Sequence, residues 1–270
     1  PSCGAHRIDP MASCRPIIAR PCDLMATMFG NPFEKRPLSR APDGMRIYAV
    51  GDIHGCAGLL DDLMAQIRAE EKADKVNAQL VFLGDYIDRG PDTSGVIDRL
   101  LALKRERPGT VFLKGNHEDV FLSFLADPGA NADWIDWGGG ELLASYGVPS
   151  SGLLEDIVRR LSETMPADHL AFLRSLELTR VIGDYLFVHA GVRPGVPLDQ
   201  QQERDLLWIR GEFHRAPEEL RPEKVVVHGH QPVKKAVDAL WRIGVDTGAC
   251  FTGRLTAVAL EGATRRFIST

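Results

Sequence analysis

The sequence lacks paired cysteines, long apolar runs and an excess of positive charge. Its five cysteines form no Cys-x-x-Cys pair, which favours a reducing compartment, and we expect the cytoplasm. No apolar run approaches the ~20 residues that cross a bilayer, so we expect no membrane partner. The 32 Lys and Arg residues are outnumbered by 37 Asp and Glu residues, and the net charge of −5 gives no general attraction to nucleic acid. Anion binding must therefore come from local cations or metals, and the composition leaves the oligomeric state open.

Residues 1–44 differ from the rest of the chain. They contain seven of the 17 prolines and three of the five cysteines and show no sustained periodicity, so we predict a poorly ordered N-terminal extension. They lack the apolar segment of about 7–15 residues that a secretory signal needs, and their acidic residues disfavour an organelle transit peptide. Because Met11, Met25 and Met28 precede any core-like segment, we expect translation to begin at one of these later methionines.

From Met45 onward, short β-branched and aromatic segments alternate with segments of helical periodicity. The alternation predicts a layered α/β fold in a single domain, residues 45–270, with a more helical insertion at about 120–178. Pro91 and Asp92 favour a helix start. Within the insertion, the glycines at 138–140 predict a tight structural turn, although an anion-binding loop stays an alternative. The strand-like segments that precede polar motifs are residues 46–50, 79–83, 110–113, 185–188 and 224–227.

Each of these strand-like segments ends at a polar motif that contains possible metal ligands. A single Asp-x-His motif is weak evidence, because it is also common in surface turns. Here, however, five of the eight histidines lie at or just beyond strand ends, where open α/β sheets bind ligands. A mixed set of imidazole, carboxylate and amide ligands suits Mn, Fe or Zn better than Ca or Mg. The motifs are Gly51-Asp52-Ile53-His54-Gly55, residues 84–90 (GDYIDRG), Gly115-Asn116-His117-Glu118, His189-Ala190-Gly191 and His228-Gly229-His230.

In this order, the motifs resemble those of the metallophosphoesterases and, within them, the phosphoprotein phosphatase family. The resemblance covers roughly residues 46–260, and residues 204–210 and 245–255 are most similar to the bacterial and phage-type members. It implies a calcineurin-like domain over residues 45–270, in which a central β-sandwich is flanked by helices and carries a dinuclear metal centre at its strand ends. Two departures, Ala190 in place of glycine and Lys114 in place of arginine, remove no ligand.

The resemblance also implies a role for each site residue. Asp52 and His54 bind the first of two divalent metals, for which we expect Mn²⁺, with Fe or Zn possible, and Asp85 bridges both. The ligands of the second metal are Asn116, His189 and His230. A hydroxide that bridges the metals attacks phosphorus, and the remaining catalytic residues are His117 as general acid, Asp88 as the carboxylate that orients it, and Arg89 and Arg210 as the phosphate clamp. We expect Glu118 and His228 to support the site and Cys56 to be a buried small residue.

The resemblance predicts a hydrolase that removes phosphate from phosphorylated proteins or peptides, and it leaves open whether the phosphate is on serine, threonine or tyrosine. A rival from the same superfamily is a symmetrical diadenosine-tetraphosphate hydrolase, whose motifs differ from this chain at Asp88, Glu118 and Gln231-Pro232. A rival of another class is a non-catalytic scaffold that binds phosphoproteins. Such a scaffold tolerates the loss of metal ligands, whereas every ligand position is filled here.

Overall fold

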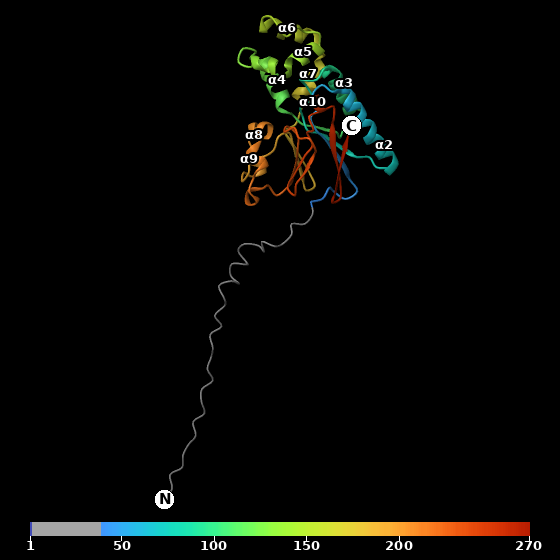
Figure 1. Cartoon of the computed structure of the whole chain (residues 1–270), viewed down its shortest axis with the longest axis vertical. Helices are drawn as coiled ribbons and strands as arrows, with labels where there is room; N and C mark the ends of the chain where they lie inside the picture. Colours follow the sequence, from blue (N-terminus) through green and yellow to red (C-terminus); the bar gives the residue numbers. More distant parts are fainter. Residues whose placement is uncertain (2–38) are drawn as a thin grey trace. The chain divides into compact units, whose positions relative to one another are not determined.

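The structure of the protein is a computed structural model that describes Pro1 and residues 39–270 (Figure 1). Residues 2–38 of the predicted extension therefore lie outside the described residues. The compact unit begins at Ser39 rather than at the predicted boundary of Met45. No helix in the described part of the chain has the length and hydrophobicity that crossing a membrane requires.

Two mixed sheets form the centre of the fold. The first has the strand order β10-β9-β1-β2-β3, in which β1, β2 and β3 are parallel and β9 is antiparallel to both of its neighbours. Its strands are β1 (Arg46–Val50), β2 (Gln79–Phe82), β3 (Val111–Phe112), β9 (Thr256–Glu261) and β10 (Thr264–Ser269). The second sheet has the order β4-β5-β6-β8-β7, with β5, β6 and β8 parallel. Its strands are β4 (Thr179–Ile182), β5 (Tyr185–Val188), β6 (Val225–His228), β7 (Val237–Asp238) and β8 (Arg242–Gly244).

The two sheets pack face to face, as predicted. One cluster of buried residues combines Ile47 and Ala49 of β1 with Phe187 of β5 and Val227 of β6. Because side chains alternate along a strand, the residues between them in β1, such as Tyr48, point to the opposite face and join a second cluster with the helices. The central strands β1, β5 and β6 are thus buried on both faces, which explains their continuous apolar runs.

Helices cover the outer faces of both sheets (Figure 1). The first sheet is covered by α2 (Ala57–Asp74) and α3 (Thr93–Glu106), and α3 begins where Asp92 Oδ1 accepts a hydrogen bond from the Gly95 N–H. The second sheet is covered by α8 (Glu203–Trp208) and α9 (Gly211–His214). The predicted insertion contains α4 (Asn116–Ala126), η1 (Ala132–Trp134), η2 (Ile135–Gly139), α5 (Gly140–Ser145), α6 (Leu154–Thr164) and α7 (Ala167–Arg174). The remaining short helices are η3 (Leu198–Gln200), η4 (Glu218–Leu220) and α10 (Ala249–Thr252).

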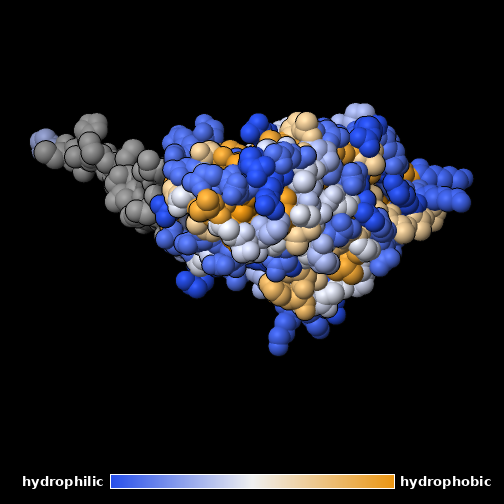
Figure 2. Space-filling model, turned by 90° about the horizontal axis from the view of Figure 1, so that it is seen from above, coloured by the Kyte–Doolittle hydropathy of each residue, from blue (hydrophilic) through white to orange (hydrophobic). Residues whose placement is uncertain are grey.

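The surface seen in Figure 2 is mostly polar. Hydrophobic residues appear there in small separate patches, which is ordinary for a globular domain.

Residues 39–41 connect the two sheets. The Ala41 N–H donates to the Gly262 carbonyl, which lies between β9 and β10 of the first sheet. The Arg40 N–H donates to Asp184 Oδ2, and the Arg40 carbonyl accepts from the Asp184 N–H beside β5 of the second sheet. Since the Ala41 side chain is also buried, this segment is part of the folded unit.

We expect a chain that starts at Ser39 to keep the melting temperature of the full chain, because residues 1–38 show no core-like pattern. A chain that starts at Met45 loses the hydrogen bonds of Arg40 and Ala41, each worth about 0.5–1.5 kcal/mol, so its melting temperature should fall by about 5 °C or more. Thermal unfolding of the three chains measures both differences. An unchanged value for the chain from Met45 would show that these contacts contribute no stability.

Candidate metal centre

The strand ends of both sheets bring all six predicted metal ligands into one buried region. Asp52 and His54 follow β1, Asp85 follows β2, and Asn116 opens α4 after β3. From the second sheet, His189 follows β5 and His230 follows β6. Each of these six residues is at most 5% exposed.

The backbone is strained where these loops turn. Of the six non-glycine residues with positive φ in the described part of the chain, five lie in this region: His54, Asp85, Asp88, Arg89 and His230. A left-handed conformation costs a residue with a Cβ about 1–3 kcal/mol, and such strain persists only where the surroundings enforce it. The loops are therefore held in the conformation that directs these side chains.

Glu118 enforces the conformation of the loop after β2. Its carboxylate accepts hydrogen bonds from the backbone N–H groups of Asp85 (2.9 Å) and Tyr86 (2.8 Å) and from that of Gly115 (2.8 Å) at the start of α4. It is the capping residue of α4, and burial together with the Asp85 carboxylate raises its pKa to about 8. The sequence predicted this supporting position for Glu118.

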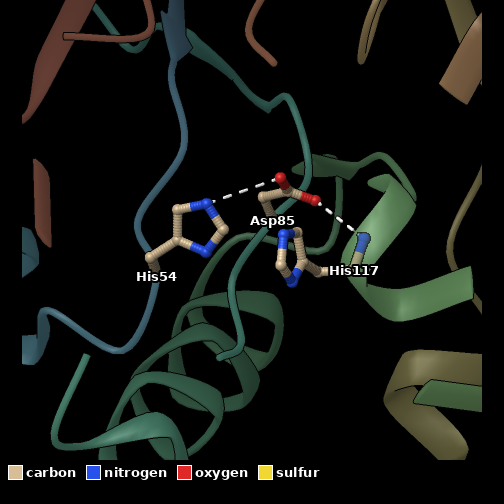
Figure 3. Close-up of side chains that lie close together, drawn as sticks. All are labelled: His54, Asp85 and His117. Atoms are coloured by element: carbon tan, nitrogen blue, oxygen red, sulfur yellow. Dashed lines mark hydrogen bonds and ion pairs between the residues drawn. The ribbon is translucent and has the colours of Figure 1, made fainter. Parts of the chain in front are cut away.

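One group of possible ligand atoms comes from His54, Asp85 and His117 (Figure 3), and these atoms all lie within 4.8 Å of one another. His54 Nε2 is 3.5 Å from Asp85 Oδ2, while Asp85 Oδ1 accepts from the His117 backbone N–H at 3.1 Å. His54 Nδ1 is 2.9 Å from the Ile87 carbonyl and donates to it, so Nε2 presents its lone pair to the site.

A second group consists of Asp85, His189 and His230, again within 4.8 Å. Asn116 joins it, since its Oδ1 is 3.0 Å from His189 Nε2 and 2.9 Å from His230 Nδ1. His189 Nδ1 lies 2.9 Å from the Leu83 carbonyl, which leaves Nε2 facing Asp85 Oδ1 at 3.5 Å. Asp85 is thus common to both groups, in the place predicted for a bridging ligand.

The histidines of the site are in the protonation state that metals need. Burial lowers the pKa of His54 to about 3 and that of His230 to about 2, and it also lowers the pKa of His189. These three rings are therefore neutral near pH 7, and a neutral imidazole is the form that binds a metal.

The site also contains crowded buried carboxylates. Burial and the carboxylates of Asp246 and Asp85 raise the pKa of Asp52 well above its usual value, and burial raises that of Asp246 to about 6. Bound cations would relieve this repulsion. The site thus combines neutral imidazoles with carboxylate and amide oxygens and surplus negative charge, which fits divalent metal ions.

Two features of this carboxylate cluster were not anticipated from the sequence. Asp52 belongs to neither group of three, and its carboxylate accepts hydrogen bonds from the His230 backbone N–H at 3.0 and 3.2 Å. Asp246 had no predicted role, yet it is buried and adds to the negative potential at Asp52. It follows β8 as Asp52 follows β1, so its position after a short apolar segment was the available signal.

His117 and Asp88 form a buried pair beside the first group. His117 Nδ1 is 2.6 Å from Asp88 Oδ2, and the same oxygen accepts from Trp134 Nε1 at 3.0 Å. Burial opposes a charge on His117, but the carboxylates of Asp85 and Asp88 outweigh it and raise its pKa. Among the buried histidines of the site, His117 thus differs in favouring the protonated form. Trp134 comes from the insertion, and no pattern in the sequence indicated its contact with Asp88.

The two arginines that we predicted to bind phosphate lie beside different groups of ligand atoms. Arg89 Nη1 is 2.8 Å from His54 Nε2, and Arg210 Nε donates to His230 Nε2 at 3.0 Å. Gly138 positions Arg89, because its carbonyl accepts the Arg89 N–H and a Cβ on it would lie 2.6 Å from Arg89 Cγ. Gly138 has a φ of 115°, so the glycine run forms a tight turn that packs on Arg89, in agreement with the structural turn predicted from the sequence.

The other residues singled out in the sequence lie beside these groups. His228 Nδ1 donates to the Gly229 carbonyl at 3.0 Å, and its ring packs on Phe213 instead of joining either group. Cys56 is partly buried, and its Sγ donates to the His54 carbonyl.

Comparison with known proteins identifies the same region. Residues 45–257 match the family described as calcineurin-like phosphoesterase. The chain is 30% identical to a symmetrical bis(5'-nucleosyl)-tetraphosphatase of Nitrosospira multiformis, over 75% of this chain and 67% of the relative. It is also 30% identical to serine/threonine-protein phosphatase 1 of Salmonella typhimurium, over 82% of this chain and 94% of the relative.

Among solved structures, a serine/threonine phosphatase of Saccharomyces cerevisiae superposes with a TM-score of 0.52 at 16% identity, covering 84% of this chain and 80% of that one. At this identity the likeness concerns the fold alone.

Proposed function

Because the chain belongs to the calcineurin-like phosphoesterases, we propose that it is a phosphoprotein phosphatase, which hydrolyses phosphate monoesters of proteins or peptides. The relatives include both protein phosphatases and nucleoside tetraphosphatases, so family membership supports phosphoester hydrolysis in general. The choice between the two substrates depends on the leaving group.

The observation that carries this proposal is the buried pair of His117 and Asp88. A nucleotide leaving group ends in a phosphate with a pKa of about 6, so it departs as an anion without a proton. A serine alkoxide is far more basic, and a tyrosine phenolate has a pKa of about 10, so both gain from a proton as the P–O bond breaks. A protonated histidine held by a carboxylate is therefore most useful for a protein phosphate ester.

Each residue of the site has a part in this proposal. Asp52, His54, Asp85, Asn116, His189 and His230 would hold two divalent ions. When bound, such ions supply Lewis-acid charge to phosphoryl oxygens and bring the pKa of a water towards neutrality. Arg89 and Arg210 hold the equatorial phosphate oxygens through their planar guanidinium groups. Water supplies the oxygen that phosphorus gains, and the oxygen that leaves takes the proton of His117, whose Nδ1 is fixed by Asp88.

A second candidate is hydrolysis of a dinucleoside tetraphosphate. Besides the relatives, one residue favours it: the Arg204 side chain forms no hydrogen bond or ion pair with any part of the chain that the structure describes. Arg204 lines a pocket together with Trp208 and Arg210, so a second phosphate group could bind there.

A panel of substrates decides between the two candidates. We expect the Mn²⁺-loaded protein to hydrolyse phosphopeptides with a higher kcat/KM than diadenosine tetraphosphate. A tetraphosphate preferred over every phosphopeptide would contradict the proposal and support the second candidate.

Metal dependence gives a separate prediction. Exhaustive chelation should abolish turnover, and Mn²⁺ should restore more activity than Mg²⁺, because a site with three imidazoles favours transition metals. The measurement is turnover of p-nitrophenyl phosphate after dialysis against chelator and readdition of each ion, with metal content determined in parallel. Full activity in protein that retains no metal would overturn the assignment of the centre.

A further inference from the structure

Aromatic side chains remain exposed at the edge of the metal centre. Trp137 is 50% exposed, although a tryptophan is a residue that a globular protein normally buries. Trp208 is partly exposed and lies in a surface pocket with Arg204 and Arg210. Exposed aromatic surface beside a reactive centre is typical of a binding site.

Trp208 and Trp137 together form a continuous wall that starts at a predicted metal ligand. The ring of Trp208 packs edge-on against His230, with 6.2 Å between the ring centroids. Trp137 packs in turn on Trp208 at 6.4 Å and an interplanar angle of 70°. Because the two rings contact each other, they cannot enclose a third ring between them, and a ligand ring would pack against their open side.

The position of Trp137 is fixed by the same segment that supports the catalytic pair. Trp137 lies in η2, directly before the kink at Gly138, whose φ is 115°. The next residue, Gly138, accepts the Arg89 N–H, and Gly139 packs so closely on Trp134 that a Cβ would lie 2.4 Å from its ring. The wall is therefore rigidly connected to the phosphate clamp and, through Trp134, to Asp88.

We propose that Trp137 and Trp208 form a subsite for an aromatic ring joined directly to the scissile phosphate, so that the substrates are proteins phosphorylated on tyrosine. This inference rests on the proposed function and specifies its substrate. Trp208 packs against His230, a predicted metal ligand, so the wall begins beside the proposed metal centre, where a ring on the ester oxygen would lie. A nucleobase lies a whole ribose further from its phosphate, and phosphoserine has no ring to pack there.

The test uses the full chain loaded with Mn²⁺ and two peptides that differ only in carrying phosphotyrosine or phosphoserine. Trp137→Ala should lower kcat/KM for the phosphotyrosine peptide about three- to tenfold, mainly through KM, because an aromatic contact is worth about 0.5–1.5 kcal/mol. Its kcat/KM for the phosphoserine peptide should stay within about twofold of wild type. Trp137→Phe keeps an aromatic ring and should retain most of the preference.

Leu240→Ala serves as the matched control, because Leu240 is an exposed hydrophobic residue between β7 and β8, and it should change neither value. A second measurement avoids turnover: phenylphosphonate should bind the wild type more tightly than methylphosphonate, and Trp137→Ala should remove the difference.

Equal losses on both peptides, or no loss on either, would overturn the subsite while phosphopeptide hydrolysis stands. A wild type that hydrolyses diadenosine tetraphosphate and no phosphopeptide would overturn both the subsite and the proposed function. A Trp137→Ala loss confined to the tetraphosphate would assign the wall to a nucleobase and overturn the inference.

Discussion

Asp85→Asn should remove both metal ions and nearly all turnover. Asp85 is the one residue shared by the two groups of ligand atoms in the described part of the chain, with Oδ2 facing His54 and Oδ1 facing His189, so it would hold an ion at either position. An amide keeps the shape but loses the charge, and it offers only one oxygen as a ligand. Since bound metals contribute several kcal/mol to the stabilisation of the transition state, we expect kcat to fall by about 10³-fold or more.

Metal content by mass spectrometry and kcat on p-nitrophenyl phosphate measure this result. Asp168→Asn is a suitable control, because Asp168 is an exposed residue of α7 and the same chemical change should have no effect there. A variant at Asp85 that retained two metals and near-normal turnover would show that neither metal depends on this carboxylate.

The positions of the strands and of most site residues were predictable from the sequence because both depend on local patterns. A buried strand needs a continuous apolar run, and a ligand loop needs polar residues and glycine directly after it. Asp85 and His54 could therefore be assigned to the site before the order of the strands was known. That order, with β9 placed next to β1, depends on contacts between distant parts of the chain.

What the sequence could not give is the contribution of side chains from other layers. Trp134 donates to Asp88 across 46 residues of sequence, from an insertion whose apolar pattern indicates only a helical core. Trp137 and Trp208 belong to different layers of the fold and meet only in the folded molecule. Such contacts leave no regular pattern in the sequence, because the path of the loops between the two residues decides whether their side chains meet.

His228 and His230 show the limit of motif reasoning within a single loop. Both follow a strand and both are histidines, so composition alone does not separate them. In the structure His230 has a φ of 61°, which turns its ring towards Asn116, whereas His228 is the last residue of β6 and packs on Phe213. The difference arises from the turn conformation at His230, where Asp52 accepts its backbone N–H.

His117→Asn should slow the hydrolysis of phosphate esters in proportion to the basicity of the leaving group. We expect a loss of about 10²–10⁴-fold on a phosphoserine peptide, because its alkoxide needs a proton. The loss should be smaller on a phosphotyrosine peptide, whose phenolate has a pKa of about 10, and smallest on p-nitrophenyl phosphate, whose leaving group departs as a stable anion. Turnover of the three substrates by wild type and variant measures this order.

Two further variants extend the same test. Asp88→Asn removes the charge that holds His117 Nδ1, and Trp134→Phe removes the second donor to Asp88 Oδ2. Both should show a weaker form of the same order, with Trp134→Phe the weaker of the two, because it leaves the His117 contact intact. Leu240→Ala should leave the turnover of all three substrates unchanged, since Leu240 is an exposed residue between β7 and β8.

Metal content separates the two roles that the geometry allows for His117. Its ring lies within 4.8 Å of the ligand atoms of His54 and Asp85, so it could also be a metal ligand. As a proton donor, His117 can be replaced without loss of metal, and the penalty follows the leaving group. As a ligand, its loss would lower the metal content and slow all three substrates equally. Equal losses with a full complement of metal would instead mean that His117 only supports the site and that the acid lies elsewhere.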